Sequence, residues 1–555
     1  MQTHQVENQS TPLVDVNLWE HDVALQSALQ ALAPAQTSSA QPRLKALGAR
    51  CGSAQAQAWA FEANQFKPQL HTHDRFGHRL DEARFHPAYH HLMALALGEG
   101  LHAQPWANPG PGAQVERAAA YYLFGQLENG VQCPVTMTYA VIPVMAQQPG
   151  LAPTWLPRLM ARDYDPNLRP VTQKTAVTMG MGMTEKQGGS DVRRNSTLAT
   201  LDGQDAWGER YTVRGHKWFF SAPMCDAFLI LAQTDPDSSA GLTCFFLPRI
   251  LPDGQRNHLR VQRLKDKIGN LSNASSEVEF EDAYVWRVGE VGRGVPTILE
   301  MGNHTRLDCA IGSAAIQRAG LIQSLHHARA RQAFGRHLAE QPLMQSVLAD
   351  LCLESEASMW LALFLARTFD ADADATQQAL RRVLTPAAKY WICKRLPHVM
   401  AESMEVLGGN GYVEEGPFGR LFRESPLNSI WEGSGNVMCL DVLRALGRGH
   451  ESAEALRALW QDARGLHPAY DAQVRATQAW LFDPARSLEE HTARAWTERI
   501  ALLTQAALLW RHAPQENAAL FVETRLGTDW RGTMGSHPAL AAQARAIMQR
   551  AWPQA

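Results

Sequence analysis

The run Gly180-Met-Gly-Met-Thr-Glu-Lys-Gln-Gly-Gly-Ser-Asp-Val192 lies where one sequence pattern replaces another. Before it, from about Leu44 to Arg162, apolar residues recur mainly at helical spacing. After it, as far as about Ala283, short apolar runs alternate with polar residues and end at Gly, Pro, Asp or Asn, which is typical of strands. Helical spacing returns from Pro296 to Leu446. This order predicts an α+β chain in which an antiparallel β-barrel or sandwich stands between two helical regions.

The clearest strand pattern is Glu277-Val-Glu-Phe-Glu281, because Val278 and Phe280 can face a core while the glutamates face water. Further strands are expected over residues 211–214, 217–220, 227–231 and 242–247. In the helical region that follows, an apolar stripe suited to a bundle core comprises Leu343, Met344, Val347, Leu348 and Leu351.

The length of 555 residues exceeds the usual size of one domain, so we expect several structural domains. The expected divisions are a loose N-terminal arm (1–42), an α-helical domain (43–175), a β-domain (176–290), a helical bundle (291–446) and an additional C-terminal helical domain (447–555).

Composition excludes several classes of protein. A net charge of −3 provides no whole-chain attraction to nucleic acid or to an anionic membrane. The eight cysteines are scattered without a Cys-x-x-Cys pair, which favours reduced thiols in a cytoplasmic protein over a zinc site or a disulfide framework. The polar N-terminus predicts no signal peptide, and the apolar runs are too short to predict a membrane span.

The stretch Ile430-Trp-Glu-Gly-Ser-Gly-Asn436 sets a carboxylate beside an indole and a flexible turn. Partial desolvation by Trp431 would raise the pKa of Glu432 and make it a stronger base, and the turn would let a ligand approach the backbone closely. The alternative is a helix start in which Ser434 or Asn436 caps the first turn and Glu432 is an ordinary surface acid. The stretch alone favours the alternative.

Two other features are ambiguous from the residues alone. The run 180–192 could cradle a carbonyl or phosphate, or it could be a plain loop between domains. It is not a dinucleotide fingerprint, because the third glycine is missing and a strand pattern follows. The histidine-dense stretch 71–91 could suggest a metal site, but its spacing fits no standard ligand set, which favours scattered histidines and no bound metal.

Together, the motifs resemble those of the acyl-CoA dehydrogenases. The resemblance covers residues 44–446 and rests on the order Met-Thr-Glu-x-x-x-Gly-Ser-Asp (183–191), Arg-x-x-Phe-Gly (331–335), Leu-Gly-Gly-x-Gly (407–411) and Glu-Gly-x-x-Asn (432–436). The residues within these motifs resemble one branch of the family more closely, the AidB-type flavoproteins of the adaptive response to DNA alkylation. Stretches that carry this closer likeness include Cys133-Pro-Val-Thr-Met-Thr138, Gly215-His-Lys-Trp-Phe-Phe-Ser221 and Thr385-Pro-Ala-Ala-Lys389.

The resemblance implies bound FAD, a homotetramer, and a flavin site completed by a neighbouring subunit. By motif, Met183, Thr184, Gly189, Ser190, Phe219, Ser221 and Trp431 would lie at the flavin ring. Ser434 and Asn436 would bind the phosphates and the ribityl chain, whereas Arg331, Phe334 and Gly409 would come from the neighbouring subunit.

The implied reaction is α,β-dehydrogenation of an acyl-CoA thioester, with weak activity expected for the AidB type. Glu432 matches one of the family's base positions and would remove the α-proton, while the flavin accepts the β-hydrogen as hydride. An ordinary acyl-CoA dehydrogenase without DNA binding is the alternative.

The AidB-type resemblance also implies sequence-independent binding of double-stranded DNA through the C-terminal region. After residue 450 the chain has eleven arginines and eleven acidic residues, so that region is formally neutral. Ion-paired helix surfaces therefore explain its arginines at least as well as DNA binding does. The DNA-contacting candidates are Arg444, Arg448 and Arg525.

Overall fold

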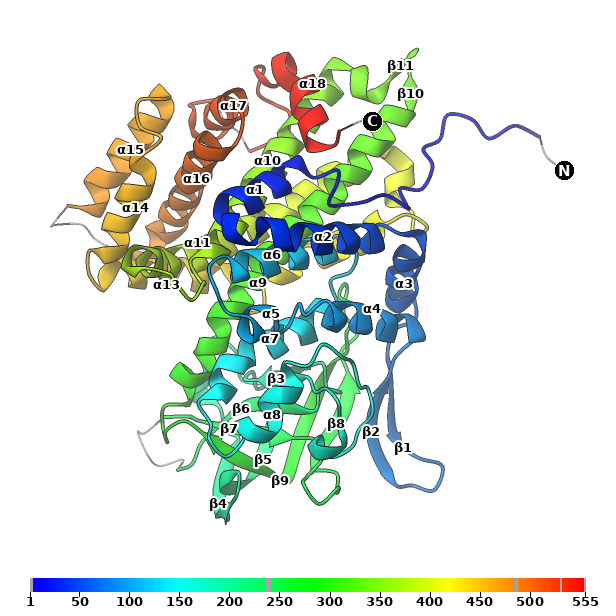
Figure 1. Ribbon diagram of the computed structural model, residues 1–555, viewed down its shortest axis with the longest axis vertical. Coiled ribbons are helices and arrows are strands. Elements are labelled where there is room, and N and C mark those ends of the chain that lie inside the picture. The colour runs from blue at the N-terminus through cyan, green and yellow to red at the C-terminus, as the bar shows by residue number, and fades with distance from the viewer. Residues whose placement is uncertain (1–2, 236–240, 484, 486–487, 530–531, 554–555) are drawn as a thin grey trace. The chain divides into compact units, whose positions relative to one another are not determined.

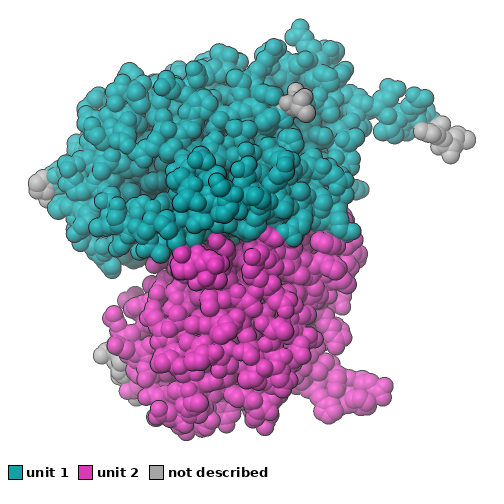
Figure 2. All heavy atoms as spheres, viewed as in Figure 1, with its two compact units in different colours: residues 1–57, 110–127, 306–555 teal, residues 58–109, 128–305 magenta. Residues whose placement is uncertain are grey.

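A computed structural model describes residues 3–235, 241–483, 485, 488–529 and 532–553. The chain forms two compact units, coloured separately in Figure 2. Unit 1 comprises residues 1–57, 110–127 and 306–555, and unit 2 comprises residues 58–109 and 128–305. Both units contain stretches that are distant in the sequence, so the five expected domains are not tested by this division and remain a prediction.

Unit 2 is built around a seven-stranded sheet (Figure 1). Its strands are β3 (Met179–Gly182), β4 (Leu198–Asp205), β5 (Gly208–Ser221), β6 (Ala227–Ala232), β7 (Thr243–Pro248), β8 (Leu259–Leu264) and β9 (Ser275–Val288). The strand order is β3-β6-β7-β9-β5-β4, and β8 also pairs with β9. All pairs are antiparallel except β3–β6, which is parallel. The predicted β-domain is therefore confirmed, with one parallel pair that the pattern did not indicate.

The alternation that predicted β9 follows the burial of its side chains. Val278 and Phe280 are 1% and 3% exposed. Val278 pairs with Lys217 of β5 and with Val261 of β8, and Phe280 pairs with Gly215 and Leu259. One face of β9 is therefore in the core, as period-two spacing requires.

Helices and a small hairpin make up the rest of unit 2. They are β1 (Gln69–His73), β2 (Arg79–Arg84), α4 (Pro87–Gly98), α5 (Gln104–Ala107), α7 (Gln132–Ala146), α8 (Ala152–Leu159) and the 3-10 turns Val171–Gln173 and Val192–Arg194. Helix α7 packs on β3, where the Thr138 hydroxyl accepts a hydrogen bond from the Met179 N–H at 3.1 Å.

Unit 1 is almost entirely helical. It contains α1 (Val23–Leu32), α2 (Pro34–Cys51), α6 (Ala113–Gly125), β10 (Gln332–Ala333), β11 (Arg336–His337), α10 (Pro342–Arg367), α11 (Ala375–Val406), α12 (Phe418–Glu424), α13 (Gly435–Gly447), α14 (Glu451–Gln461), α15 (Pro468–Leu481), α16 (Ala493–His512), α17 (Gln515–Leu526) and α18 (Leu540–Ala551). Its 3-10 turns are Leu338–Glu340, Gly408–Tyr412, Leu427–Ser429 and Glu490–Thr492. Helices α3 (Ala54–Gln65) and α9 (Gly294–Ala330) each contribute residues to both units.

Helix α10 is central to unit 1, because it contacts α6, α11, α16 and α18. Leu348 and Leu351 are fully buried there, as the predicted stripe requires. Leu343, in the first turn of the same helix, is 86% exposed, so the core prediction is wrong for that residue. Spacing defines a helix face, but it does not show which turns of that face find a partner.

The expected loose arm is shorter than residues 1–42. Helix α1 begins at Val23, and Asp22 caps it by accepting a hydrogen bond from the Leu25 N–H at 3.0 Å. Leu25 and Leu29 are fully buried, and Arg318 of α9 pairs with Asp22 at 3.1 Å. Burial of this apolar face stabilises helices where composition alone suggested an arm.

Three histidines of the dense stretch have separate structural roles. His86 caps α4, His90 lies 2.8 Å from the Tyr164 hydroxyl oxygen, and His91 stacks on Trp59. Among the described residues, no group of three or more His, Cys, Asp or Glu side chains is placed to hold a metal ion. No helix in the described part of the chain combines the length and apolar character needed to cross a bilayer.

Candidate active site

Two cations hold the backbone on both sides of Glu432. Lys389 of α11 is fully buried, and its ammonium donates to the carbonyl oxygens of Trp431, at 2.8 Å, and of Gly433. Arg306 of α9 donates through Nε to the carbonyl oxygen of Glu432 at 3.0 Å. Glu432 itself has φ of +58°, a left-handed conformation that is uncommon outside glycine. Such strain persists where surrounding contacts over-determine it, and it is concentrated at functional sites.

The indole beside Glu432 is fixed by a chain of hydrogen bonds. Trp431 Nε1 donates to Asn428 Oδ1 at 2.8 Å, and Asn428 Nδ2 donates to the Ser313 hydroxyl at 3.0 Å. Trp431 and Glu432 are half-buried. The Glu432 side chain therefore projects from a backbone that hydrogen bonds hold on both sides, next in sequence to an indole that is also held.

Ser434 and Asn436 lie at the start of α13, where the capping alternative put them. Ser434 occupies the cap position, but its side chain makes no capping hydrogen bond. Asn436 Oδ1 instead accepts a hydrogen bond from Arg494 Nε of α16 at 2.9 Å. Because arginine only donates, this contact directs the Asn436 amide NH₂ group away from α16. The helix start is confirmed, whereas the expected side-chain cap is not.

In unit 2, the loop over residues 183–191, called the Thr184 loop below, is anchored by a buried carboxylate. Glu185 is fully buried and accepts hydrogen bonds from Lys217 Nζ at 2.7 Å, the Thr197 hydroxyl at 2.6 Å and the Ser196 N–H at 2.7 Å. Burial acts to raise the pKa of Glu185, but the charge and hydrogen bond of Lys217 outweigh it and lower that pKa to about 2. Glu185 is therefore a structural anion.

This anchor holds the loop against strand β5. The Trp218 N–H donates to the Thr184 carbonyl oxygen at 2.8 Å, and Phe219 on the same strand is 54% exposed. A Cβ atom at Gly189 would lie 2.7 Å from the Thr184 hydroxyl oxygen, so only glycine permits this close approach. The Met183 carbonyl oxygen accepts a hydrogen bond from Asn195 Nδ2 at 2.8 Å. Ser190 is exposed, and the Ser221 hydroxyl lies 3.2 Å from that of Ser275.

The predicted flavin residues thus form separate groups. Unit 2 contains Met183, Thr184, Gly189, Ser190, Phe219 and Ser221, and unit 1 contains Arg331, Phe334, Gly409, Trp431, Glu432, Ser434 and Asn436. Within unit 1, Phe334 is fully exposed at the tip of the β10–β11 hairpin, and Gly409 is exposed in the turn Gly408–Tyr412.

The DNA candidates differ in exposure. Arg444 is exposed but pairs with Asp441 at 2.6 Å, and Arg448 is exposed with no acidic partner among the described residues. Arg525 is 3% exposed, and its Nη2 contacts Asp350 at 2.5 Å and Glu354 at 3.0 Å. The prediction that Arg525 contacts DNA is therefore wrong, because its guanidinium is enclosed by carboxylates of α10.

Sequence reasoning gave no role to Lys389, Arg306, Glu185 or Lys217. Three of them were within quoted motifs: Glu185 is the glutamate of Met-Thr-Glu-x-x-x-Gly-Ser-Asp (183–191), Lys389 ends Thr385-Pro-Ala-Ala-Lys389, and Lys217 lies in Gly215-His-Lys. A lysine inside an apolar run is the signal that could have drawn attention to each of the two lysines, because an unpaired ammonium is rarely buried.

Three family models match the chain in succession. The AidB N-terminal domain of the adaptive response protein matches residues 8–166, the acyl-CoA dehydrogenase middle domain matches 180–283, and the acyl-CoA dehydrogenase C-terminal domain matches 292–447. These matches agree with the order helices, sheet and helices.

Full-length relatives extend the likeness. The chain is 44% identical over 531 residues to AidB of Escherichia coli (strain K12), which covers 95% of each protein. The solved apo form of Bd2924 is 30% identical, with a TM-score of 0.81 and coverage of 91% of this chain and 99% of that one. Caenorhabditis elegans ACDH-11, solved in complex with C11-CoA, is 25% identical, with a TM-score of 0.86 and coverage of 99% and 97%. The chain therefore belongs to the AidB-type acyl-CoA dehydrogenases and is an FAD-dependent oxidoreductase of that family.

Proposed function

We propose that the protein catalyses α,β-dehydrogenation of an acyl-CoA thioester with Glu432 as the base. The observation that carries this proposal is the pinned, left-handed backbone of Glu432 between the Lys389 and Arg306 contacts. Membership of the acyl-CoA dehydrogenase family supports the substrate class, and ACDH-11 was solved with an acyl-CoA.

The chain's own groups suit removal of a weakly acidic α-proton. Lys389 and Arg306 bind peptide oxygens, so they fix the backbone from which the carboxylate projects. Trp431 and Glu432 are both half-buried, and a bound substrate would exclude more water from the Glu432 carboxylate and raise its basicity. The Glu432 carboxylate takes the proton from the α-carbon, and a Cα–Cβ double bond forms.

Residues in both units fit parts of FAD. In unit 2, Phe219 follows Trp218, whose N–H donates to the Thr184 carbonyl oxygen, and its exposed ring suits a flat aromatic system. In unit 1, the first turn of α13 has N–H groups without a side-chain cap, next to Asn436 and Arg494, which suits phosphate. When bound, FAD supplies the acceptor for the β-hydrogen and its electron pair. We assign Arg331, Phe334 and Gly409 to the flavin site of a neighbouring subunit in a homotetramer.

Glu432→Gln tests the base assignment directly. The variant should retain yellow FAD, but anaerobic bleaching by acyl-CoA thioesters should slow by about 100-fold or more, because an amide cannot accept the α-proton. Glu415→Gln, which changes an exposed acid outside this segment, is the matched control. Unchanged bleaching in Glu432→Gln would remove that residue from the role.

Binding of double-stranded DNA, with a role in the response to DNA alkylation, is a second candidate function. Exposed Arg448, which has no acidic partner in the described part of the chain, favours it together with Arg444. Most other C-terminal arginines for which contacts are known are committed to ion pairs, namely Arg457, Arg511, Arg525 and Arg550. This pairing favours the alternative of an ordinary acyl-CoA dehydrogenase.

Retention on duplex DNA at 50 and 200 mM salt separates these two functions. DNA binding through phosphates predicts sequence-independent retention that falls steeply with salt and is weakened by Arg448→Ser. Absent or salt-insensitive retention would leave dehydrogenation alone. A cytoplasmic location completes the proposal, supported by eight cysteines that are all buried and form no disulfide.

A further inference from the structure

The side chain of Asn8 pairs with β10 as a strand backbone would. Its Nδ2 donates to the Gln332 carbonyl oxygen at 2.8 Å, and its Oδ1 accepts from the Gln332 N–H at 2.7 Å. One amide side chain thus satisfies both polar groups of an exposed edge residue. Asn8 adopts φ of +55°, a conformation that asparagine tolerates better than most residues.

The Asn8 backbone and the three residues after it make further contacts within unit 1. Arg331 Nη1 donates to the Asn8 carbonyl oxygen at 2.5 Å, and Asn410 Nδ2 donates to Gln9 Oε1 at 3.0 Å. The Ser10 hydroxyl lies 2.9 Å from His327 Nδ1, and the Thr11 carbonyl oxygen lies 2.7 Å from His326 Nε2. Residues 8–11 therefore link the end of α9 and the β10–β11 hairpin to the turn Gly408–Tyr412.

The hairpin is one that needs outside support. Its strands are two residues long, and its turn places Phe334 at φ of +52° and Gly335 at +76°. A short hairpin of this kind is marginal alone, and a left-handed phenylalanine adds strain. Gln341 Nε2 supports one side by donating to the Ala333 carbonyl oxygen at 2.8 Å. Asn8 supports the other side through Gln332.

The linked loops carry a surface suited to another molecule. Phe334 is fully exposed and Tyr412 is 84% exposed. A strained residue is rarely retained merely to expose an aromatic ring to water, and exposed apolar residues on neighbouring loops mark contact sites. In the proposed tetramer, this surface meets the flavin site of a second copy.

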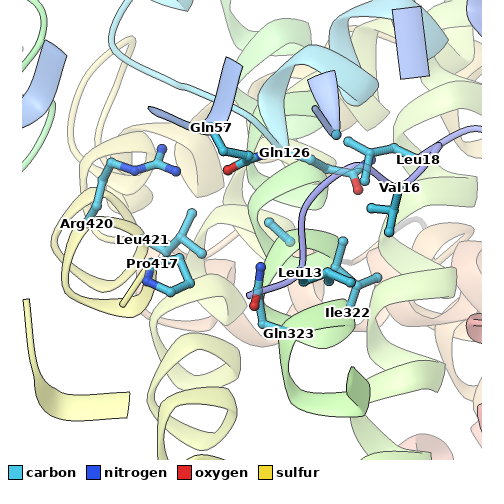
Figure 3. Close-up of a pocket in the computed structure, with 12 residues that line it drawn as sticks. Leu13, Val16, Leu18, Gln57, Gln126, Ile322, Gln323, Pro417, Arg420 and Leu421 are labelled. Carbon is cyan, nitrogen blue, oxygen red and sulfur yellow. The ribbon is translucent and has the colours of Figure 1, made fainter. Parts of the chain in front are cut away.

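Polar contacts rather than burial hold residues 8–11. Residues 3–9 are exposed, and the next stretch lines a pocket with Ile322 and Gln323 of α9 and Arg420 and Leu421 of α12 (Figure 3). Leu13, Val16 and Leu18 are its lining residues from the N-terminal segment. The pocket has an empty volume of about 380 Å³, including the solvent at its mouth. Close packing resumes at Leu18 and Trp19, each 3% exposed, so point changes should release residues 8–11 without unfolding unit 1.

We propose that residues 8–11 form a clasp that holds the Phe334 hairpin and the Gly409 turn in position for the adenosine end of FAD bound to a neighbouring subunit. This inference rests on the proposed function, because it uses the assignment of those loops to a shared flavin site; their place at the adenosine end of FAD, away from the ring, is itself part of the inference. Asn8 is a positioning residue in it, acting through Gln332 and Arg331.

Two substitutions separate the amide of Asn8 from its backbone conformation. Asn8→Gly keeps φ of +55° accessible but removes both side-chain hydrogen bonds. Asn8→Asp keeps the acceptor for the Gln332 N–H but replaces the donor with an oxygen that repels the Gln332 carbonyl. Gln5→Ala changes an exposed residue three positions earlier and is the matched control.

The effect of the clasp on flavin binding is measured by the affinities of the full-length protein for FAD and for FMN. Asn8→Gly should weaken FAD binding by about tenfold, the effect of two lost hydrogen bonds, and Asn8→Asp should weaken it less. FMN lacks the adenosine end, so its affinity should be unchanged in both variants. If Asn8 had only a structural role, its loss would weaken the binding of FAD and of FMN to the same extent. Equal FAD affinity in Asn8→Gly and the parent, or parallel losses of FAD and FMN, would overturn the proposal.

Hydrogen exchange at the Gln332 amide tests the clasp without flavin. This N–H donates to Asn8 Oδ1, so it should exchange faster in Asn8→Gly and at the parent rate in Gln5→Ala. An unchanged rate in Asn8→Gly would refute the clasp even if the parent protein bound no FAD. Failure of the parent to bind FAD, with faster exchange in the variant, would instead count against the proposed function and against the clasp's role in flavin binding.

Discussion

Glu185 and Glu432 are both glutamates in loops rich in glycine, but cations hold them in opposite ways. At Glu185, the Lys217 ammonium contacts the carboxylate itself, and neighbouring hydroxyl and N–H groups complete its shell. At Glu432, the Lys389 and Arg306 cations contact the peptide oxygens of residues 431–433. At the first site, the Glu185 carboxylate holds the loop in place. At the second, the cations hold the peptide backbone and so fix the position from which the Glu432 side chain projects.

This difference separates an anchor from a candidate base. A carboxylate whose pKa lies near 2 is a poor proton acceptor at neutral pH, whereas a general base works best with a pKa closer to the operating pH. The two residues also differ in backbone strain, because Glu432 is among the non-glycine residues with positive φ and Glu185 is not. Loss of the Glu185 carboxylate should therefore lower the free energy of unfolding, whereas replacement of Glu432 by glycine should raise it and abolish the chemistry.

The largest effect should follow loss of the lysine at the anchor. Lys217→Met leaves the Glu185 carboxylate buried without its counter-ion, which should lower the free energy of unfolding by about 3–5 kcal/mol. Urea unfolding measures this change, and exposed Lys186→Met in the same loop is the control. Equal stability of Lys217→Met and the parent would show that the ion pair is not the anchor.

The same anchor predicts a dependence of stability on pH. Because the folded-state pKa of Glu185, about 2, lies below the ordinary value of 4.5, its stabilisation is present above pH 4.5 and is lost as the pH falls toward 2. Glu185→Gln cannot titrate. The difference in unfolding free energy between parent and Glu185→Gln should therefore shrink across this window, and a constant difference would contradict the assignment.

A smaller effect on stability, with a larger effect on chemistry, is expected at Lys389. Lys389→Met leaves the carbonyl oxygens of Trp431 and Gly433 without their donor, which should lower the free energy of unfolding by about 2 kcal/mol. Because Glu432 is then displaced, acyl-CoA bleaching should slow by roughly 10- to 100-fold. Arg382→Met, which changes an exposed residue of the same helix, should bleach at the parent rate. Equal rates for the two variants would contradict the proposed role of Lys389.

Local periodicity was enough to predict much of the fold. The alternation around Val278 and Phe280 predicted β9, because a strand with one buried face has that pattern in its own sequence. Leu343 shows the limit of this method, because only the neighbours of α10 decide which turns of its apolar face are covered.

The contacts that define the site could not be predicted in this way. Lys217 meets Glu185 from 32 residues away, because the register of β5 carries it beneath the Thr184 loop. Gln332 meets Asn8 across 324 residues. Arg525 was expected at a DNA surface, but the α10 carboxylates that enclose it precede it by 171 and 175 residues. Motif resemblance indicated Glu432, whereas the cations that hold its backbone required a structure.

The smallest expected effect has the opposite sign. Glu432→Gly removes a side chain from a left-handed position, which should raise the free energy of unfolding by up to about 1 kcal/mol, after allowance for the greater freedom of glycine in the unfolded chain. The variant should not bleach with acyl-CoA. Glu415→Gly, at a position without positive φ, should instead lose about 0.5–1 kcal/mol. A stability gain combined with loss of chemistry is what a strained base predicts. If Glu432→Gly lost as much stability as Glu415→Gly, the left-handed conformation would carry no strain, and the strain-based part of the argument for Glu432 as the base would fail.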